Sequence, residues 1–209
     1  MSIATFTESI IESGPLDPRA APLLADLIRE YDSRYGRVFN PEGAQAEIDR
    51  YPPAAFKPPQ GNFLLLLRGG ETIAGGAFMR FDDSTAEVKR VWTRSDFRRQ
   101  GLAQRIMQAL EDQAAAQGYT RIYLTTGFRQ PEAVALYLGL GYRPLFLPEL
   151  DPALYKLLPF EKHIGALAGQ PGTSPLKVPS PELARNLHAK LALKAQLDAE
   201  APERFELSS

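Results

Sequence analysis

The feature that most constrains this chain is a short glycine-containing junction between a strand and a helix. Residues 86–93 are strand-like, and residues 101–117 place apolar side chains at helical spacing. Gly118 follows at a C-cap position, and residues 121–126 form the next predicted strand. The apolar residues of the helix are Leu102, Ile106, Leu110 and Ala114. This region therefore predicts a strand, a loop, an amphipathic helix and a second strand, in that order.

The junction has the composition of an anion-binding site. A helix N-terminus presents unpaired backbone N–H groups and partial positive charge, which suits a phosphate. Gly101 lets a ligand approach the backbone closely, and the small Ala103 keeps the first turn open. Arg98 and Arg99 add full positive charges. We therefore predict an anion site here, and a pyrophosphate is the anion that fits best.

Other phosphate-binding loops fit this junction poorly. A P-loop requires G-x-x-x-x-G-K-S/T, and no Lys-Ser or Lys-Thr pair follows Gly101. A dinucleotide fingerprint requires G-x-G-x-x-G, and the junction holds a single glycine. By itself the string R-x-x-G-x-A also fits an ordinary glycine at a helix start, flanked by solvated arginines. The neighbouring segments have to decide between these interpretations.

The composition excludes several classes of mechanism. The chain has no cysteine, which removes disulfides, thiolate metal sites and acyl-cysteine chemistry. Its two histidines, His163 and His188, lie late in the chain, so we predict no metal site. The net charge of -1 gives no basic field for nucleic acid or an anionic membrane. The apolar run 63–67 is too short to span a bilayer, and the first residues do not resemble a signal peptide, so we expect a cytoplasmic protein.

The N-terminal third predicts two helices and a hairpin. Asp17-Pro18 and Asn40-Pro41 each combine an N-cap residue with a proline at the first helical position. Gly69-Gly70 separates two strand-like segments and predicts a tight turn. The remaining predicted elements are strands at residues 2–11, 62–68 and 71–81 and a proline-rich loop at residues 51–61.

The C-terminal part changes in composition. A helix at residues 131–140 and strands at residues 142–147 and 153–162 are predicted first. We then predict a boundary, with one domain over 1–164, a Gly-, Pro- and Ser-rich linker over 165–180 and a helical tail over 181–209. The tail is predicted from the stripe Leu183, Leu187 and Leu191. Such a tail could dock on its own domain or across a homodimer.

Two signatures in this order resemble a known family. The strand, R-x-x-G-x-A loop and amphipathic helix resemble motif A of the GNAT N-acyltransferases. Downstream, residues 130–137, Q-P-E-A-V-A-L-Y, and residues 140–142, L-G-Y, resemble the family pattern N-x-x-A-x-x-x-Y followed by L-G-F/Y. Gln130 departs from the commonest asparagine. The resemblance covers residues 62–147 closely and implies the GNAT fold, an α/β domain of α+β type with a mixed, mostly antiparallel twisted sheet flanked by helices.

The resemblance implies acetyl-CoA, bound between two parallel strands that diverge. By position, backbone groups of Val91 and Thr93 would hold the pantetheine arm, and the Val91 N–H would donate to the oxyanion. The amides of residues 99–103 would bind the pyrophosphate. Trp92 and Phe97 are expected to have packing side chains. The implied cofactor-binding residues are Val91, Trp92, Thr93, Arg98, Arg99, Gln100, Gly101, Leu102, Ala103, Gln130 and Ala133.

The resemblance also implies transfer of an acetyl group to a primary amine through a tetrahedral intermediate. Such an amine, with a pKa of ~10.4, is protonated at neutral pH, so a base has to deprotonate it. Glu87 is the candidate, because the histone-acetyltransferase branch places a glutamate on this strand. Strand alternation would put Glu87 on the same face as Lys89, Val91 and Thr93. The alternative is a structural carboxylate paired with Lys89 or Arg90.

Tyr137 is the candidate proton donor to the leaving thiolate. It occupies the motif position where many GNAT proteins keep a tyrosine near the thioester sulfur. The alternative is a core aromatic of the predicted helix at residues 131–140.

The acceptor is the least constrained part of the prediction. In this superfamily its pocket involves the first two helices, which here carry acidic and aromatic residues. These would suit a small cationic amine or a peptide, or else form a solvated face. They are Glu30, Tyr31, Asp32, Tyr35, Glu42 and Glu47. Two other functions stay open: a non-catalytic acyl-CoA-binding sensor on the same fold, and an interaction protein in which the tail matters most.

Overall fold

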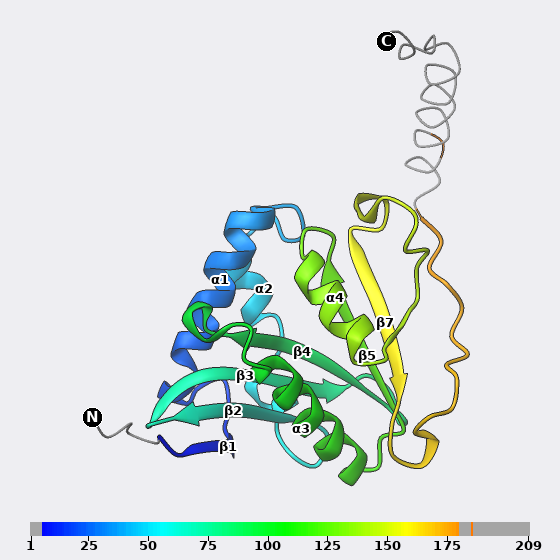
Figure 1. Cartoon of the computed structure of the whole chain (residues 1–209). Helices are drawn as coiled ribbons and strands as arrows, with labels where there is room; N and C mark the ends of the chain where they lie inside the picture. The colour runs from blue at the N-terminus through cyan, green and yellow to red at the C-terminus, as the bar shows by residue number, and fades with distance from the viewer. Residues whose placement is uncertain (1–5, 180–184, 186–209) are drawn as a thin grey trace, which may run out of the picture.

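A single mixed sheet organises the protein. The structure, a computed structural model, describes residues 6–179 and 185, and within them seven strands form one sheet in the order β1-β2-β3-β4-β5-β7-β6 (Figure 1). β4 and β5 are parallel, and the other neighbouring strands are antiparallel. The strands are β1 Glu8–Glu12, β2 Asn62–Arg68, β3 Glu71–Arg80, β4 Thr85–Thr93, β5 Arg121–Gly127, β6 Arg143–Pro144 and β7 Leu157–His163. The predicted mixed, mostly antiparallel sheet is confirmed.

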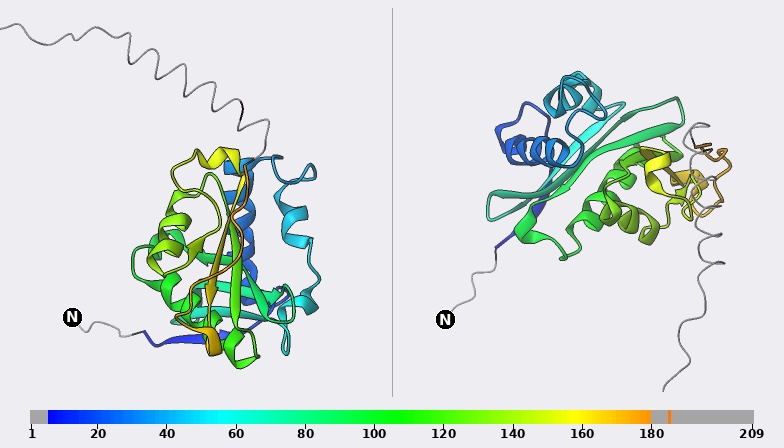
Figure 2. Two further views of the ribbon diagram at one scale, coloured as in Figure 1. Left: turned by 90° about the vertical axis from the view of Figure 1, so that its right-hand side faces the viewer. Right: turned by 90° about the horizontal axis from the view of Figure 1, so that it is seen from above.

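Two pairs of helices cover opposite faces of the sheet. Helices α1 (Ala21–Tyr35) and α2 (Ala44–Asp49) lie on one face, and α3 (Leu102–Ala116) and α4 (Pro131–Gly139) lie on the other (Figure 2). The sheet thus separates two hydrophobic clusters. One is built with α1 and α2, and the other with α3 and α4. We refer to these two sides as the α1–α2 face and the α3–α4 face.

The first residues of α1 and α2 differ from those that the local N-cap signals predict. Asp17 accepts a hydrogen bond from the Arg19 backbone N–H, as an N-cap does, but this cap opens a 3-10 turn before α1 begins. Helix α2 begins at Ala44 rather than at the predicted Asn40-Pro41 signal. The Ala44 N–H donates to the Asp32 carboxylate, 3.2 Å away on α1. A tertiary contact therefore sets this helix start.

The hairpin is confirmed, whereas the last strands differ from the prediction. Gly69 and Gly70 adopt φ angles of 59° and 87°, which glycine accepts without strain, and they join β2 to β3. The strand predicted at residues 142–147 shortens to β6, because Phe146 turns into the core against Phe160 with ring centroids 5.3 Å apart. The strand predicted from residue 153 begins only at Leu157.

The segment predicted as a linker packs on the domain over its described residues. The Ser174 hydroxyl donates to the buried Glu161 carboxylate, and Lys177 donates to the Leu157 carbonyl oxygen at 2.8 Å. Both contacts tie this segment to β7. The predicted tail at residues 181–209, with its leucine stripe, lies outside the described residues apart from Arg185.

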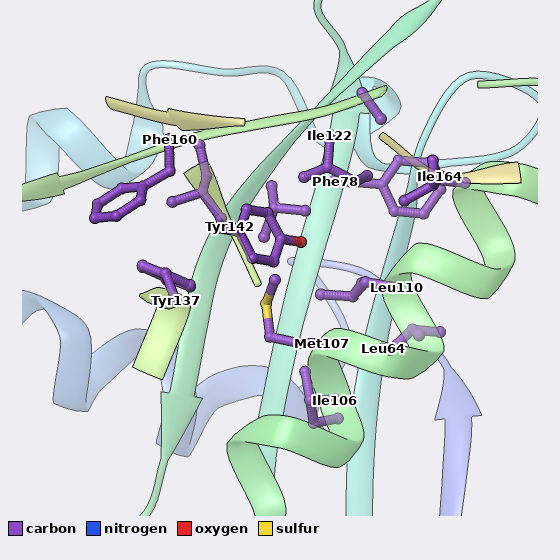
Figure 3. Packing of buried hydrophobic residues seen from close by; sticks show 14 of the residues in the cluster. Leu64, Phe78, Ile106, Met107, Leu110, Ile122, Tyr137, Tyr142, Phe160 and Ile164 are labelled. Carbon is purple, nitrogen blue, oxygen red and sulfur yellow. The ribbon is translucent and has the colours of Figure 1, made fainter. Parts of the chain in front are cut away.

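The larger cluster fills the α3–α4 face. Met107 and Ile106 from α3 meet Tyr137 from α4 and Phe160 from β7, and all four are buried (Figure 3). The Tyr137 ring lies 5.8 Å from Tyr142 and 5.6 Å from Phe160 between ring centroids. Burying side chains of this size contributes roughly 1.5–3 kcal/mol each. This packing fixes α3 and α4 against the sheet and thereby positions the residues of the site.

Candidate active site

The parallel strands β4 and β5 diverge at the centre of the sheet. Their pairing runs from Thr85–Arg121 to Val88–Leu124. Beyond Val88, β4 continues to Thr93, and β5 continues to Gly127, without pairing to each other (Figure 1). The facing edges of the two strands therefore have no partner strand between them. Backbone groups left in this way can hydrogen-bond an extended ligand.

A β-bulge lies in the diverging part of β4. Lys89 pairs with Ala77 and Trp92 pairs with Gly75, so two residues of β4, Arg90 and Val91, oppose one residue of β3. Arg90 adopts φ 60°, a left-handed conformation that is uncommon outside glycine. An extra residue of this kind reverses the alternation of side chains beyond it.

The bulge corrects the predicted alternation along β4. Lys89 lies on the α1–α2 face, with its ammonium group 4.7 Å from the Tyr51 ring centroid. Val91 instead packs against the cluster on the α3–α4 face. Glu87 pairs with Met79, which packs against the cluster on the α1–α2 face. The prediction that Glu87 and Lys89 share a face with Val91 and Thr93 is therefore wrong, because period-2 alternation holds only in a regular strand.

The predicted anion site is open at the N-terminus of α3. Gly101 adopts φ 73°, and no side chain among the described residues caps the helix there. A Cβ placed on Gly101 would have no atom within 4 Å. The first-turn N–H groups of a helix have no partner inside that helix, so these amides are free to bind an anion. Arg99 adds a second left-handed residue, with φ 62°.

The arginines and the glutamine of the junction differ in their contacts. Arg98 is half exposed, and its Nε donates to the Thr93 carbonyl oxygen at 3.4 Å. Gln100 accepts a hydrogen bond from Arg68 at 3.1 Å. Arg99 is exposed. The junction therefore keeps positive charge beside the open helix N-terminus.

Two further observations bear on whether a cofactor fits between the strands. The Thr93 Oγ1 is buried and has no hydrogen-bond partner among the described residues. Trp92 is buried on the α1–α2 face, and its indole N–H donates to Asp26 at 3.1 Å. Of Trp92, only the backbone is thus available to a ligand between β4 and β5. The orphaned hydroxyl and the open helix N-terminus fit an extended, phosphate-bearing cofactor.

Gln130, the residue that departs from the family pattern, fastens β5 to α4. Its side-chain oxygen accepts hydrogen bonds from the Gly127 N–H at 3.1 Å and the Thr126 hydroxyl at 3.0 Å. Ala133 packs against the core beside it. Gln130 therefore holds the end of β5, where β5 has separated from β4.

Glu87 is held by its neighbour on the strand. The Lys89 ammonium group donates to its carboxylate at 2.8 Å, and both side chains are largely buried. Glu87 does not line the cavity described below, whereas Lys89 does. The ion pair named as an alternative is thus present, and a role of Glu87 as a base stays a prediction.

Tyr137 combines a packed ring with an uncommitted hydroxyl. Burial raises its pKa, and the nearby Tyr31 raises it further. The hydroxyl makes no hydrogen bond within the part of the chain that the structure describes, although Tyr142 beside it donates to Glu111 at 2.8 Å. A phenol with a raised pKa keeps its proton at neutral pH. Tyr137 therefore retains a proton that it can donate.

A cavity of about 210 Å³ lies between the first two helices and the diverging strands. Of the six residues predicted for the acceptor pocket, Tyr31, Tyr35 and Glu47 line it. Burial, with Glu30 and Glu47 nearby, raises the pKa of Tyr31 to about 12. The other three acidic residues do not line it: Glu30 pairs with Arg34, Asp32 caps α2, and Glu42 is exposed.

Sequence reasoning named Arg90 only as a possible partner of Glu87 and missed that it lines this cavity. It is buried, with 8% of its surface exposed. The signal that could have found it is the doublet Lys89-Arg90 inside an otherwise alternating strand, because in a regular strand two adjacent charges would lie on opposite faces.

The described residues, 6–179 and 185, lack two features. They contain no group of three or more His, Asp or Glu side chains arranged to hold a metal ion. None of the helices in this part of the chain has the length and apolar character needed to cross a membrane.

Comparison with known proteins connects this geometry to a family. Residues 24–142 match the model of the acetyltransferase (GNAT) family. An IAA acetyltransferase from Azospirillum brasilense is 29% identical over 128 residues, which cover 59% of this chain and 81% of that protein.

Solved structures share the fold at low sequence identity. A GNAT-family acetyltransferase from Staphylococcus aureus aligns with a TM-score of 0.59 and 16% identity, over 75% of this chain and 99% of that one. The PaiA N-acetyltransferase from Thermoplasma acidophilum, solved with coenzyme A, aligns with a TM-score of 0.54 and 14% identity, over 75% and 99%. Relatives with this fold thus bind coenzyme A. The family match over more than half of the sequence, the shared fold and the diverging strands lead to one conclusion: this chain belongs to the acetyltransferase (GNAT) family.

Proposed function

We propose that this chain transfers the acetyl group of acetyl-CoA to a primary amine. The observation that carries the proposal is the divergence of β4 and β5 beyond the Val88–Leu124 pair. The divergence leads from β4 through the junction to the open N-terminus of α3, and residues of both strands line the cavity at the first two helices. One path thus joins an anion site, an unpaired strand edge and a pocket.

Backbone groups of the chain would hold the cofactor. Val91 and Thr93 would present their unpaired edge to the pantetheine arm, and the amides of residues 99–103 would bind the pyrophosphate. The Val91 N–H would stabilise the negative charge that develops on the thioester oxygen. Arg98 and Arg99 add charge beside the phosphates. Few side chains are required, which agrees with the low identity between this chain and the structures that share its fold.

Acetyl-CoA supplies an acetyl group activated as a thioester. In the proposed reaction, the nitrogen of the neutral amine bonds to the carbonyl carbon, and the carbon–sulfur bond breaks. The Tyr137 hydroxyl would hydrogen-bond to the departing sulfur and give it a proton, and the attacking nitrogen would return a proton to the phenolate as the amide forms. The proton lost by the ammonium group of the acceptor has to leave through a base.

Glu87 is proposed as that base, acting directly or through one water. Its carboxylate lies on the α1–α2 face and pairs with Lys89, which lines the cavity, whereas Glu87 itself does not line it. Glu47 is the carboxylate that lines the cavity and is therefore the competing base. Measuring activity after each carboxylate is substituted in turn distinguishes Glu87 from Glu47 as the base.

The experiment measures release of the free CoA thiol against a panel of amines, beside calorimetric titration of the protein with acetyl-CoA. We expect binding and amine-dependent thiol release. Binding without release to any amine would favour the alternative, an acyl-CoA-binding sensor on the same fold. Absence of binding at millimolar acetyl-CoA would overturn both. The cytoplasmic location, the homodimer and the absence of nucleic-acid and membrane partners stay predictions.

A further inference from the structure

Arg90 is a buried cation with an incomplete set of partners. One guanidinium nitrogen donates to the Ile48 carbonyl oxygen at 2.6 Å. The group lies over the Phe56 ring, 4.3 Å from its centroid. The other terminal nitrogen, Nη1, is buried and has no hydrogen-bond partner among the described residues. A buried charged donor without a hydrogen-bond partner destabilises the folded state, so such a group requires an explanation.

The acidic residues near Arg90 do not provide that partner. No carboxylate of the described residues lies within 4.0 Å of its guanidinium group. Asp49 attracts Arg90 from a distance, but its carboxylate is exposed and accepts a hydrogen bond from Gln45 at 2.8 Å. Burial lowers the pKa of Arg90, and the group still remains charged at neutral pH because an arginine starts so high.

The other cations that line the cavity are already paired. Lys89 holds Glu87 at 2.8 Å, and Arg50 lies 3.7 Å from Glu47. These two pairs leave Arg90 as the cation without an acidic partner among the described lining residues. The cavity therefore has one uncompensated positive charge, which lies on its β4 wall.

The backbone conformation of Arg90 supports a functional role for its side chain. Arg90 sits at the β-bulge with φ 60°, and strained positions of this kind persist where the surrounding structure requires them. The bulge turns Arg90 to the same face as Lys89, toward the cavity. In a regular strand the side chains of these two residues would point to opposite faces.

We propose that Arg90 binds a carboxylate of the acceptor, so that the substrates are amines that also carry a carboxylate, of the amino-acid class. This inference rests on the proposed function. An arginine is the residue best suited to a carboxylate, because its N–H groups are planar and always charged. The free nitrogen carries two N–H groups that can donate to a carboxylate, whereas a phosphate, with more charge and more acceptor oxygens, needs further donors. Glu47 on the other wall can attract the ammonium group of the same molecule.

The test compares each amino acid with its amide, which keeps the amine but removes the negative charge. α-, β- and γ-amino acids form the series, because the γ pair has amines of nearly equal pKa in acid and amide. We expect kcat/KM, measured by thiol release, to be at least about tenfold higher for the acid than for its amide in the pair that reacts fastest. Equal values for acids and amides across the series, with transfer intact, would overturn the Arg90 inference and leave the proposed function standing. A preference for ethanolamine phosphate over every acid would also overturn it.

Variants of Arg90 test whether the preference for acids over amides depends on this residue. R90M keeps an apolar stem over Phe56 and should reduce kcat/KM for acids about tenfold to a hundredfold while leaving amides nearly unchanged. R90K keeps a charge without the planar fork and should retain part of the preference. The control R29M removes an exposed arginine of α1 that pairs with Asp26, and it should change nothing. An acid preference that survives in a folded R90M, shown by circular dichroism and thermal melting, contradicts the assignment.

Binding decides the inference if no amine is acetylated. The proposed function then fails, but carboxylate binding is still measurable as a ligand-induced rise in Tm of the protein with CoA present. Amino acids should raise the Tm of the natural chain and their amides should not. If R90M does not fold, this measurement and the acid-to-amide ratio of the natural chain carry the test. Equal shifts for acids and amides would overturn the inference.

Discussion

The Lys89 ammonium group donates a 2.8 Å hydrogen bond to the Glu87 carboxylate, and the two side chains lie on the face of the sheet that holds the cavity. Lys89 lines the cavity, whereas Glu87 does not. If Glu87 is the base, the proton passes to a carboxylate that already accepts a hydrogen bond from Lys89. A test of Glu87 as the base therefore has to include Glu47, the carboxylate that lines the cavity.

Glu87→Gln preserves the size of the side chain and removes its basicity. We expect a loss on the order of a hundredfold in kcat at neutral pH, partly recovered at high pH where free amine is plentiful. The pH profile of thiol release measures this. Glu47→Gln is the matched comparison, since it removes the carboxylate that lines the cavity. If Glu47→Gln shows the pH-dependent loss and Glu87→Gln retains near-full activity, Glu47 is the base and Glu87 is structural.

Tyr137→Phe removes only the hydroxyl that is proposed to protonate the sulfur. It should lower kcat more than it raises the KM for acetyl-CoA, because the proton is needed as charge develops on the leaving group. Steady-state kinetics, with chemistry shown to be rate-limiting, measure the split. Tyr142→Phe is the control: it breaks a buried hydrogen bond to Glu111 and should cost about 1–3 kcal/mol of stability with kcat unchanged. Unchanged kcat in Tyr137→Phe would make Tyr137 a packing residue.

Gly101→Val should abolish binding of acetyl-CoA and leave the fold in place. A side chain at Gly101 would meet no protein atom within 4 Å, so it would project into the space proposed for the pyrophosphate. The left-handed backbone adds strain, and Gly118 at the other end of α3 supplies the control for that strain, with φ 94° and equally open surroundings. Gly118→Val should therefore lose comparable stability and bind acetyl-CoA normally by calorimetry. Equal binding by the two variants would refute the assigned pyrophosphate site.

Glu161 should make stability depend on acid pH. It is fully buried, and burial opposes its ionisation, yet Ser174 and Arg143 hold its pKa below the usual value. A carboxylate whose folded pKa is depressed stabilises the fold above its unfolded pKa of about 4.3 and loses that contribution as pH falls through the lower, folded value. The free energy of unfolding, from denaturant titration, should fall between about pH 5 and pH 3.

Glu161→Gln should remove this part of the pH dependence and cost about 3 kcal/mol at neutral pH, because it leaves buried partners unpaired. Glu71→Gln is the control, since Glu71 is exposed and its ion pair with Arg94 is worth little. A Glu161→Gln profile parallel to that of the natural chain would contradict the assignment.

Local sequence patterns were sufficient for several of the regular elements and for the open helix N-terminus at the predicted anion site. Gly69-Gly70 determines the turn between β2 and β3, because both residues need positive φ angles that glycine adopts freely. The apolar spacing of α3 and the glycine before it likewise predict a helix with an open N-terminus. These features depend on neighbouring residues, so the sequence shows them directly, and the two family signatures extend them to the fold.

Tertiary structure decided the faces of β4 and the chemistry of the cavity. The bulge at Arg90 depends on pairing with β3, and it places Arg90 beside Lys89 where simple alternation would separate them. The start of α2 depends on Asp32 from α1, and the docking of the segment after β7 depends on Glu161. Each of these contacts joins residues that are distant in the sequence or set by strand register. By itself the sequence determined most of the elements and the family of this protein. Only the folded chain decided which charged side chains line the cavity, because burial and pairing arise between segments.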